Sequence, residues 1–427
     1  MESKNLKEFV YMRKYARYKD SGVSWIGDVP EHWNLLRLKN TVTLICEKTS
    51  DSTLPYIGLE NIVSWSGELL KGSYEPDADA NKFEKDDVLF SKLRPYLAKC
   101  FLADFRGKCS SELLVFRDFQ GEKRYLKNIL LSYGFVDLVN ASTYGTKMPR
   151  ANWNFIGNCR IPVPPFPEQK AIAEYLDKKT AQINELVSAK QKQIELLKEY
   201  KQSVIANAVT GKLDERREKR KWKDSGISWI GKIPENWEVK RIRHVFNESD
   251  EKITDNTGEL LSLSQYTGVS LKRDCEKVGM FEAETTEGYK IVHRNQFVMN
   301  IMLAWNGSYA VSELEGVISP AYCVFNFIID CAPKYFHYLL RLKAYAGAFK
   351  TLSKGIIDSR LRLYPSKFYT FPVIIPPLSE QKEIVAYIEK KVSSIDSQIA
   401  SIENQIANMN EYKQSLISDV VTGKVKV

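Results

Sequence analysis

Two loops of this sequence carry side chains suited to contact with nucleic acid. The first, TYGTKMPRANWNF at 143 to 155, offers Lys147, Arg150, Asn152 and Asn154. The second, SKGIIDSRLRLYPSKF at 353 to 368, offers Lys354, Arg360, Arg362 and Lys367. Arg and Lys can pair with guanine edges or phosphates, and Asn can pair with adenine through two hydrogen bonds. The alternative is a solvated surface loop, but both loops precede a Pro-Pro turn at equivalent places in a repeat.

Two further segments mix polar and aromatic residues upstream of these loops. SKLRPYLAKC at 91 to 100 contains Lys92, Arg94 and Tyr96, and its counterpart NIMLAWNGSY at 300 to 309 contains Asn300, Trp305 and Asn306. Their apolar residues also fit a strand packed in a core, so two interpretations stay open. In one the polar members face a DNA groove, and in the other the segments are structural.

Motifs for catalysis are missing from the sequence. Neither TGK, at 210 to 212 or at 422 to 424, has the glycine and hydroxyl residue of a phosphate-binding loop, and no GxGxxG, GxSxG, HExxH or Asn-Pro-Pro-aromatic motif occurs. Seven cysteines form no CxxC pair, and the adjacent Asp86 and Asp87 are predicted to be surface residues. We therefore predict a binding protein that is not an enzyme by itself, with no catalytic residue, metal or cofactor of its own.

The elements that must position these loops occur twice. KDSGVSWIGDVPEHW at 19 to 33 returns as KDSGISWIGKIPENW at 223 to 237, and PPFPEQKAIAEYLDKK at 164 to 179 returns as PPLSEQKEIVAYIEKK at 376 to 391. The stretches between these repeats barely agree, and they contain short β-type runs with a few helical patterns. A shared frame with divergent contents indicates one α+β scaffold that carries two different recognition surfaces.

A long helical pattern closes each copy. Apolar residues recur along both patterns on a seven-residue period, which predicts a coiled coil with an intramolecular partner. The residues of this seam are Leu176, Ile183, Ile194 and Leu197 in the first copy and Ile388, Ile395, Ile402 and Met409 in the second. Lys190, Lys201 and the equivalent Lys413 interrupt the seam, and Gly211 and Gly423 stand where helix C-caps are expected.

Length and composition set the outer limits. The 427 residues allow several domains, and 62 Lys and Arg against 53 Asp and Glu favour a polyanionic partner without requiring one. No apolar run reaches membrane-spanning length, so we expect a cytoplasmic protein without a membrane partner. The predicted divisions are a basic arm (1–18), a recognition domain (19–160), a helix (161–211), a charged linker (212–222), a second recognition domain (223–372) and a second helix (373–427).

The chain resembles the specificity subunits of type I restriction-modification systems over nearly its whole length. The resemblance is carried by the twice-used DSGxSWIG with Pro-Glu-x-Trp, by DVLFSKLRPYL at 87 to 97, by GKCSSELLVF at 107 to 116 and GVISPAYCVF at 316 to 325, and by the Pro-Pro-x-x-Glu-Gln helix starts that lead to VTGK. Each motif is modest alone, and their duplication in this order is specific.

The resemblance implies a mechanism. Two globular target recognition domains would each read half of a bipartite double-stranded DNA target, and two long helices, antiparallel and related by a pseudo-twofold axis, would set the spacer. Two modification subunits would dock on the helices and methylate adenine, and restriction subunits can join them. S-adenosylmethionine, ATP and Mg²⁺ would then belong to the partners. A four-residue insertion near Ala189 would lengthen the spacer by about one or two base pairs.

Two other readings compete with this one. A tandem adaptor would use its coiled coil to join proteins, and its basic charge would be incidental. A free-standing DNA methyltransferase or nuclease would need a methyl-donor or metal site that the sequence does not display.

Overall fold

The computed structural model describes residues 13–70, 80–213, 220–275, 285–355 and 360–427. These form two compact units, Met1–Lys192 with Ile402–Val427 and Gln193–Ser401, here called unit 1 and unit 2. Each unit therefore holds part of each long helix. Most of the predicted N-terminal arm and charged linker, at 1 to 12 and 214 to 219, lies outside the described residues.

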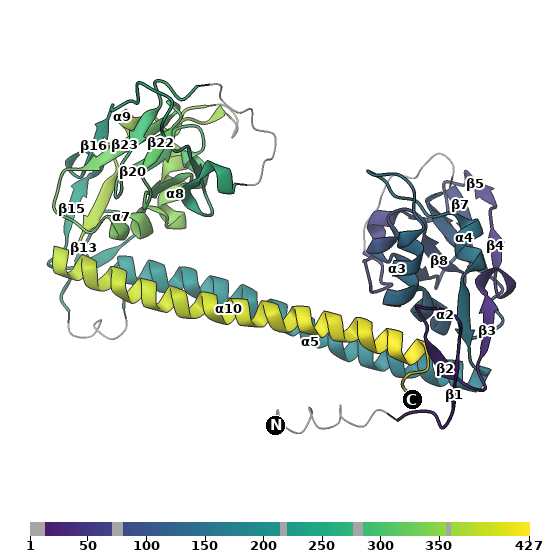
Figure 1. Cartoon of the computed structure of the whole chain (residues 1–427). Coiled ribbons are helices and arrows are strands. Elements are labelled where there is room, and N and C mark those ends of the chain that lie inside the picture. Colours follow the sequence, from purple (N-terminus) through teal and green to yellow (C-terminus); the bar gives the residue numbers. More distant parts are fainter. Residues whose placement is uncertain (1–12, 71–79, 214–219, 276–284, 356–359) are drawn as a thin grey trace. The chain divides into compact units, whose positions relative to one another are not determined.

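Unit 1 is built on two four-stranded sheets (Figure 1). One has the antiparallel order β4-β11-β8-β9, and the other has the order β5-β7-β10-β6, in which only the pair of β10 and β6 is parallel. β8 and most of β11 are buried, as expected for the apolar runs VLFS and LLVFR in the middle of a sheet. The strands are β4 Thr43–Ile45, β5 Lys48–Thr49, β6 Tyr56–Ile57, β7 Ala80–Phe83, β8 Val88–Ser91, β9 Cys100–Leu102, β10 Gly107–Cys109 and β11 Leu113–Arg117.

Smaller elements complete unit 1. Two antiparallel strand pairs join β1 Tyr18–Asp20 to β2 Asp28–Pro30 and β3 Asn34–Arg37 to β12 Arg160–Val163. The short helices are α2 Lys123–Leu130, α3 Tyr133–Ala141, α4 Trp153–Asn158, η2 Leu38–Asn40, η3 Leu59–Asn61 and η4 Pro95–Leu97.

Unit 2 has a related plan, with one four-stranded sheet where unit 1 has two. Its main sheet has the antiparallel order β16-β23-β20-β21, with strands Phe246–Ser249, Tyr322–Phe327, Phe297–Asn300 and Tyr309–Val311. Four antiparallel pairs flank it: β13 Trp222–Asp224 with β14 Lys232–Pro234, β15 Glu238–Arg241 with β24 Pro372–Ile375, β17 Leu261–Ser264 with β18 Gly268–Leu271, and β19 Lys290–Val292 with β22 Gly316–Ile318. The short helices are α7 Pro333–Leu340, α8 Lys343–Leu352, α9 Pro365–Phe368, η5 Ile242–His244, η6 Lys272–Asp274 and η7 Ala304–Asn306.

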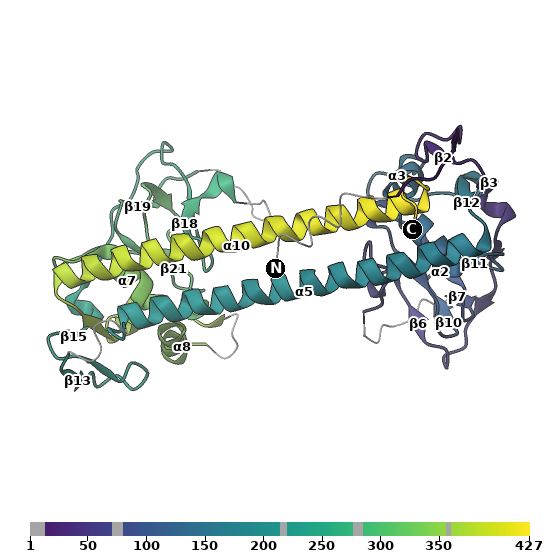
Figure 2. The same ribbon diagram turned by 90° about the horizontal axis from the view of Figure 1, so that it is seen from below.

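The long helices α5 (Phe166–Val209) and α10 (Leu378–Val421) have 44 residues each and pair antiparallel within each unit, as Figure 2 shows from below. Six of the eight predicted seam residues are buried, and Leu197 and Met409 are half-buried. The predicted fold class, α+β with two tandem domains and two long paired helices, is confirmed.

The lysines that interrupt the apolar seam each bond a polar residue of the other long helix. Lys201 donates to the Asp396 carboxylate at 2.8 Å, and the equivalent Lys413 donates to Asn184 Oδ1 at 3.0 Å. Lys190 bonds Gln405 across the helices. Burial lowers the pKa of Lys413. Because a misaligned partner would leave such a lysine unbonded, these pairs favour one register of the two helices.

The Pro-Pro-x-x-Glu-Gln starts attach each long helix to its unit. Gln381 is buried, its Nε2 donates to the Pro376 carbonyl, and its Oε1 accepts from the Ala332 amide at 2.9 Å. Gln169 makes the same two bonds, to Pro164 and from the Glu122 amide. Each glutamine thus joins the start of a long helix to the start of α7 or α2.

The neighbouring glutamates hold the repeated tryptophans. Trp33 Nε1 donates to Glu168 and Trp237 Nε1 donates to Glu380, and both indoles are fully buried. At the other end of the helices, Gly211 and Gly423 have φ of 74° and 77°. A Cβ at either place would collide with Pro234 or Pro30. The predicted glycine C-caps are therefore confirmed.

Candidate nucleic-acid interface

In unit 1 the two predicted binding segments form one surface. Leu93 and Arg150 form an isolated β-bridge, the Arg94 amide donates to the Pro149 carbonyl at 2.7 Å, and the Ala151 amide donates to Lys92 at 2.8 Å. The loop at 143 to 155 therefore lies directly on the segment at 91 to 100, although about fifty residues separate them in the sequence.

The segment at 91 to 100 holds a tight and strained turn. Arg94 and Ala98 have left-handed φ values of 49° and 44° on either side of η4. Each such residue costs about 1 kcal/mol or more, and the surrounding structure must hold it in place. The turn leaves the Tyr96 side chain 45% exposed, within a surface formed by backbone of both segments. An exposed aromatic ring beside basic residues can contact a base or sugar.

The predicted polar residues of unit 1 differ in whether their side chains already bond other residues of the chain. Arg150 makes a bidentate ion pair with Glu112 at 3.1 Å, and Asn152 Oδ1 caps α4 by accepting from the Asn154 amide. Lys147 is exposed and Lys92 is half-buried. Within the described residues no ion pair engages these two lysines, so both can meet a phosphate, whereas Arg150 and Asn152 must exchange existing partners.

Unit 2 brings its own two segments together in the same way. The Leu363 amide donates to the Ile301 carbonyl at 3.0 Å, and Lys354 and Arg362 exchange backbone hydrogen bonds at 2.9 Å. The side chains of Lys354, Arg360 and Lys367 are exposed, and Arg362 is half-buried with a bond to the Leu361 carbonyl. The middle of this loop, at 356 to 359, lies outside the described residues.

The upstream segment of unit 2 is largely structural in its contacts. Asn300 is buried and its Oδ1 accepts from the Met302 amide. Trp305 donates to the Met302 carbonyl, and the Lys350 ammonium lies 5.2 Å from the centre of its ring. Asn306 accepts from Ser308. All thirteen predicted DNA-binding residues thus stay predictions, and their contacts divide them into exposed cations and residues that shape the loops.

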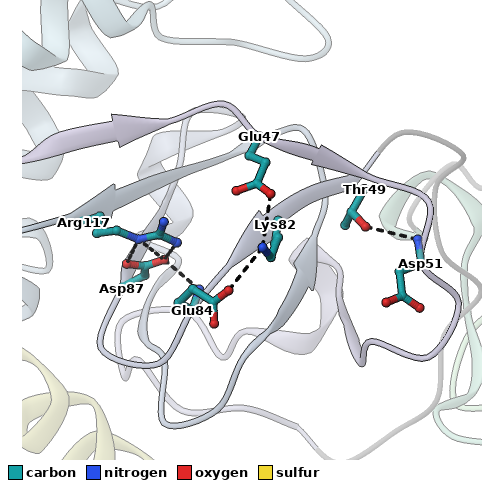
Figure 3. A network of polar contacts seen from close by, with 7 residues as sticks. All are labelled: Glu47, Thr49, Asp51, Lys82, Glu84, Asp87 and Arg117. Carbon is teal, nitrogen blue, oxygen red and sulfur yellow. Dashed lines mark hydrogen bonds and ion pairs between the residues drawn. The ribbon is translucent and has the colours of Figure 1, made fainter.

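An ion pair that the sequence did not reveal lies where β8 begins and β11 ends, the two central strands of one unit 1 sheet (Figure 3). Asp87 is buried, accepts three hydrogen bonds from Arg117 at 2.7 to 3.2 Å, and accepts another from the Glu84 amide. Lys82 lies between Glu47 and Glu84 in the same view. The prediction that Asp86 and Asp87 are both surface residues is wrong for Asp87, whose charge is offset by an arginine 30 residues away in the sequence.

The same place in unit 2 holds a neutral pair. Gln296 Nε2 donates to Asn326 Oδ1 at 2.7 Å, and Gln296 Oε1 accepts from the His293 amide as Asp87 accepts from Glu84. A position that tolerates either an ion pair or an amide pair has a structural role. Among the residues that the structure describes, no group of three or more His, Cys, Asp and Glu could hold a metal ion. No described helix is long and apolar enough to cross a membrane.

Comparison with known proteins matches two regions of the chain to one family. A family model described as the type I restriction modification DNA specificity domain matches residues 20–196 and again 234–408. The chain belongs to this family. Each match contains both segments of one candidate surface and the first part of one long helix.

Known family members are similar over nearly the full chain or over a little less than half of it. The type I restriction enzyme MjaVIII specificity subunit of Methanocaldococcus jannaschii is 24% identical, with 93% of this chain and 94% of that protein covered. The EcoKI specificity subunit of Escherichia coli K12 is 26% identical over 44% of this chain and 45% of that protein.

Solved structures share the fold. A chain from a study of type I R-M complex assembly and conformational transition matches with a TM-score of 0.68 and 17% identity, covering 92% of this chain and 98% of that one. The HsdS subunit from Thermoanaerobacter tengcongensis matches with a TM-score of 0.51 and 16% identity, covering 93% and 98%.

Proposed function

We propose that this family member reads a bipartite DNA sequence, one half with each unit. The observation that carries the proposal is the double family match, in which each matched region contains its own pair of converging segments with exposed cations. The two surfaces differ in sequence, so the two half-sites differ. Phosphate contacts would come from Lys92, Lys147, Lys354, Arg360 and Lys367.

The chain itself contributes recognition and positioning. Methyl transfer to adenine would be performed by two modification subunits docked on α5 and α10, and restriction subunits can join them. S-adenosylmethionine, ATP and Mg²⁺ would be bound by those partners. Because a duplex hides its bases, the specificity subunit must place its partners over the base that is flipped out.

Adenine-methylation mapping tests this proposal. The chain is expressed with its modification subunit in a host free of adenine methylation, and the modification subunit alone is the control. A single bipartite motif with a fixed gap, absent from the control, is the expected result. A stable complex that methylates no motif would favour the coiled-coil adaptor. Methyl transfer by the purified chain alone would favour a free-standing methyltransferase.

A further inference from the structure

A groove of about 770 Å³ opens within unit 2, between α5 and the junction of α7 and α8. One wall is formed by α5 and the turn after it, from Lys198 to Lys212. The other wall runs from His337 to Ala344, and Trp229 and Tyr266 complete the lining. Its size is in the range of sites that hold a small molecule or several side chains of a bound segment.

All charged groups that line the groove are cations, namely Lys198, Lys201, Lys212, Arg341 and Lys343. Lys201 pairs with Asp396. Arg341 donates to the carbonyls of Tyr309, Gln265 and Tyr266, and Lys212 donates to that of Ile230. Within the described residues, four of the five cations have no carboxylate at ion-pair distance. The groove therefore presents positive charge that no carboxylate of the described residues neutralises, apart from Asp396 at Lys201.

The remaining lining combines apolar and aromatic residues with the neutral polar residues Gln202, Ser203, Asn207 and Thr210. Tyr266 is 82% exposed at the turn between β17 and β18, and Trp229 is 40% exposed. Ile205 and Leu342 add aliphatic surface between them. Burial lowers the pKa of His337 to about 4, so its ring is neutral at pH 7. A phosphate backbone offers little for these apolar groups to contact, whereas an amphipathic protein segment offers both charge and apolar side chains.

The corresponding place in unit 1 has a different character. A smaller pocket of about 200 Å³ lies between α2, α5 and α10, with Lys127 and Lys413 in its lining. Glu68 and Asp177 line it as well, so cations and carboxylates are balanced. The excess of positive charge is thus specific to the groove of unit 2 and does not follow from the shared scaffold.

The groove is connected to the candidate recognition loop by one helix. Lys343, at the start of α8, lines the groove, and Leu352, at its end, leads directly into the loop at 353 to 368. Ten residues of helix span about 15 Å. A ligand in the groove would therefore contact the helix that carries the DNA-reading loop of unit 2.

We propose that this groove receives an acidic, amphipathic segment of a partner protein. The identity of that partner rests on the proposed function, under which it is the modification subunit. Docking there would place the partner against α8 and fix the helix from which the recognition loop of unit 2 extends. The attraction would be electrostatic in part, so binding would weaken as salt screens the lysines.

Charge reversal tests the groove. The variant Lys198→Glu with Lys343→Glu changes two exposed, unpaired lining residues. We expect it to bind the purified modification subunit at least about tenfold more weakly in calorimetry near 0.1 M salt, with a smaller salt dependence. The matched control is Lys232→Glu with Arg243→Glu, which alters the same charge at exposed positions of unit 2 outside the groove, and it should bind normally.

A second variant probes the apolar wall without a change of charge. Tyr266→Ser should weaken the partner about threefold and leave the salt dependence intact, because only apolar contact is removed. Unchanged partner affinity in both variants would overturn the proposal. Loss of duplex binding by the charge-reversed chain alone, with normal partner affinity, would also overturn it and identify a nucleic-acid surface. Both results concern variants only. The proposed function is tested separately, by the bipartite motif that the wild-type chain methylates with its modification subunit.

Discussion

At the scale of single residues, the two units solve the same local problem with different chemistry. Asp87 is only 2% exposed and depends on Arg117, whereas Gln296 and Asn326 make a neutral pair at the same place. An isolated carboxylate in that position would lose its hydration without compensation. Asp87 can therefore be buried as a carboxylate only because Arg117 neutralises it. The neutral amide pair needs no such compensation.

Arg117→Ala should destabilise unit 1 by about 3 kcal/mol, because it leaves the Asp87 carboxylate buried without its partner. Asn326→Ala, the matched change in unit 2, should cost only about 1 kcal/mol, since it removes one hydrogen bond between neutral groups. Hydrogen exchange in β8 and β11, compared with β20 and β23, measures the two effects separately. Equal losses in both units would contradict this account of the pair.

His337 predicts a dependence of stability on pH. Its Nδ1 accepts a hydrogen bond from the Val311 amide at 3.3 Å, which requires an unprotonated nitrogen. Burial first, and then the nearby Arg341, lower its pKa from the usual 6.5 to about 4, while Glu313 opposes the shift and Lys334 adds to it. The unfolded chain thus takes up a proton near pH 6.5 that the folded chain takes up only near pH 4.

Unit 2 should therefore be most stable above pH 6.5 and lose about 3 kcal/mol as the pH falls to about 4. Hydrogen exchange of β21 and α7, corrected for the intrinsic effect of pH, follows this loss. His337→Gln should flatten the profile, because glutamine keeps an acceptor and does not titrate. The exposed His244 of unit 2, for which the described residues hold no ion pair, serves as control, and His244→Gln should leave the profile unchanged. An unaltered profile in the His337 variant would assign the pH dependence to other groups.

At the scale of elements, the sequence predicted the features that repeat along the chain, such as the helix seam. It did not predict side-chain contacts between residues far apart in the sequence. The seven-residue period predicted the seam, and the seam residues Ile388 and Ile395 are buried. The bond between Arg150 and Glu112 joins residues 38 apart, and no local pattern indicates such a contact. Asn300 likewise has the residue type of a base reader, but burial and a bond to the next turn occupy its amide.

The glutamine of each helix start offers a test at this scale. Gln381→Leu would leave the Pro376 carbonyl and the Ala332 amide without their partner in a buried place, at a cost of about 2 kcal/mol or more. The effect should appear as faster hydrogen exchange at the start of α7, which the glutamine ties to α10. Gln398→Leu, an exposed position on the same helix, is the control and should be nearly neutral. Normal protection of α7 in the Gln381 variant would show that apolar packing alone holds it.

At the scale of the whole molecule, the duplicated frame separates two tasks. The residues shared by the two copies hold the long helices, the tryptophans and the glycine caps, and the residues that differ line the two candidate surfaces. A change of base contacts in one surface should therefore alter one half-site only, whereas a change of phosphate contacts should alter neither half-site. Lys147→Ala, for example, should lower the salt slope of duplex binding by about one unit without altering the motif, and the exposed Lys39→Ala should have no effect.

Helix length provides the last prediction. Four residues inserted near Ala189 in α5, with four more beside Gln405 on the antiparallel partner, add about 6 Å to both helices and make a stutter that a heptad seam can absorb. Since duplex DNA rises 3.4 Å per base pair, methylation mapping should show both half-sites intact and the gap longer by about one or two base pairs. Four residues added after Lys212, beyond the end of α5 at Val209, are the control and should leave the gap unchanged. An active double-insertion variant with the original gap would mean that the helices do not set the spacing. The length of the gap would then have to be determined by the recognition units themselves.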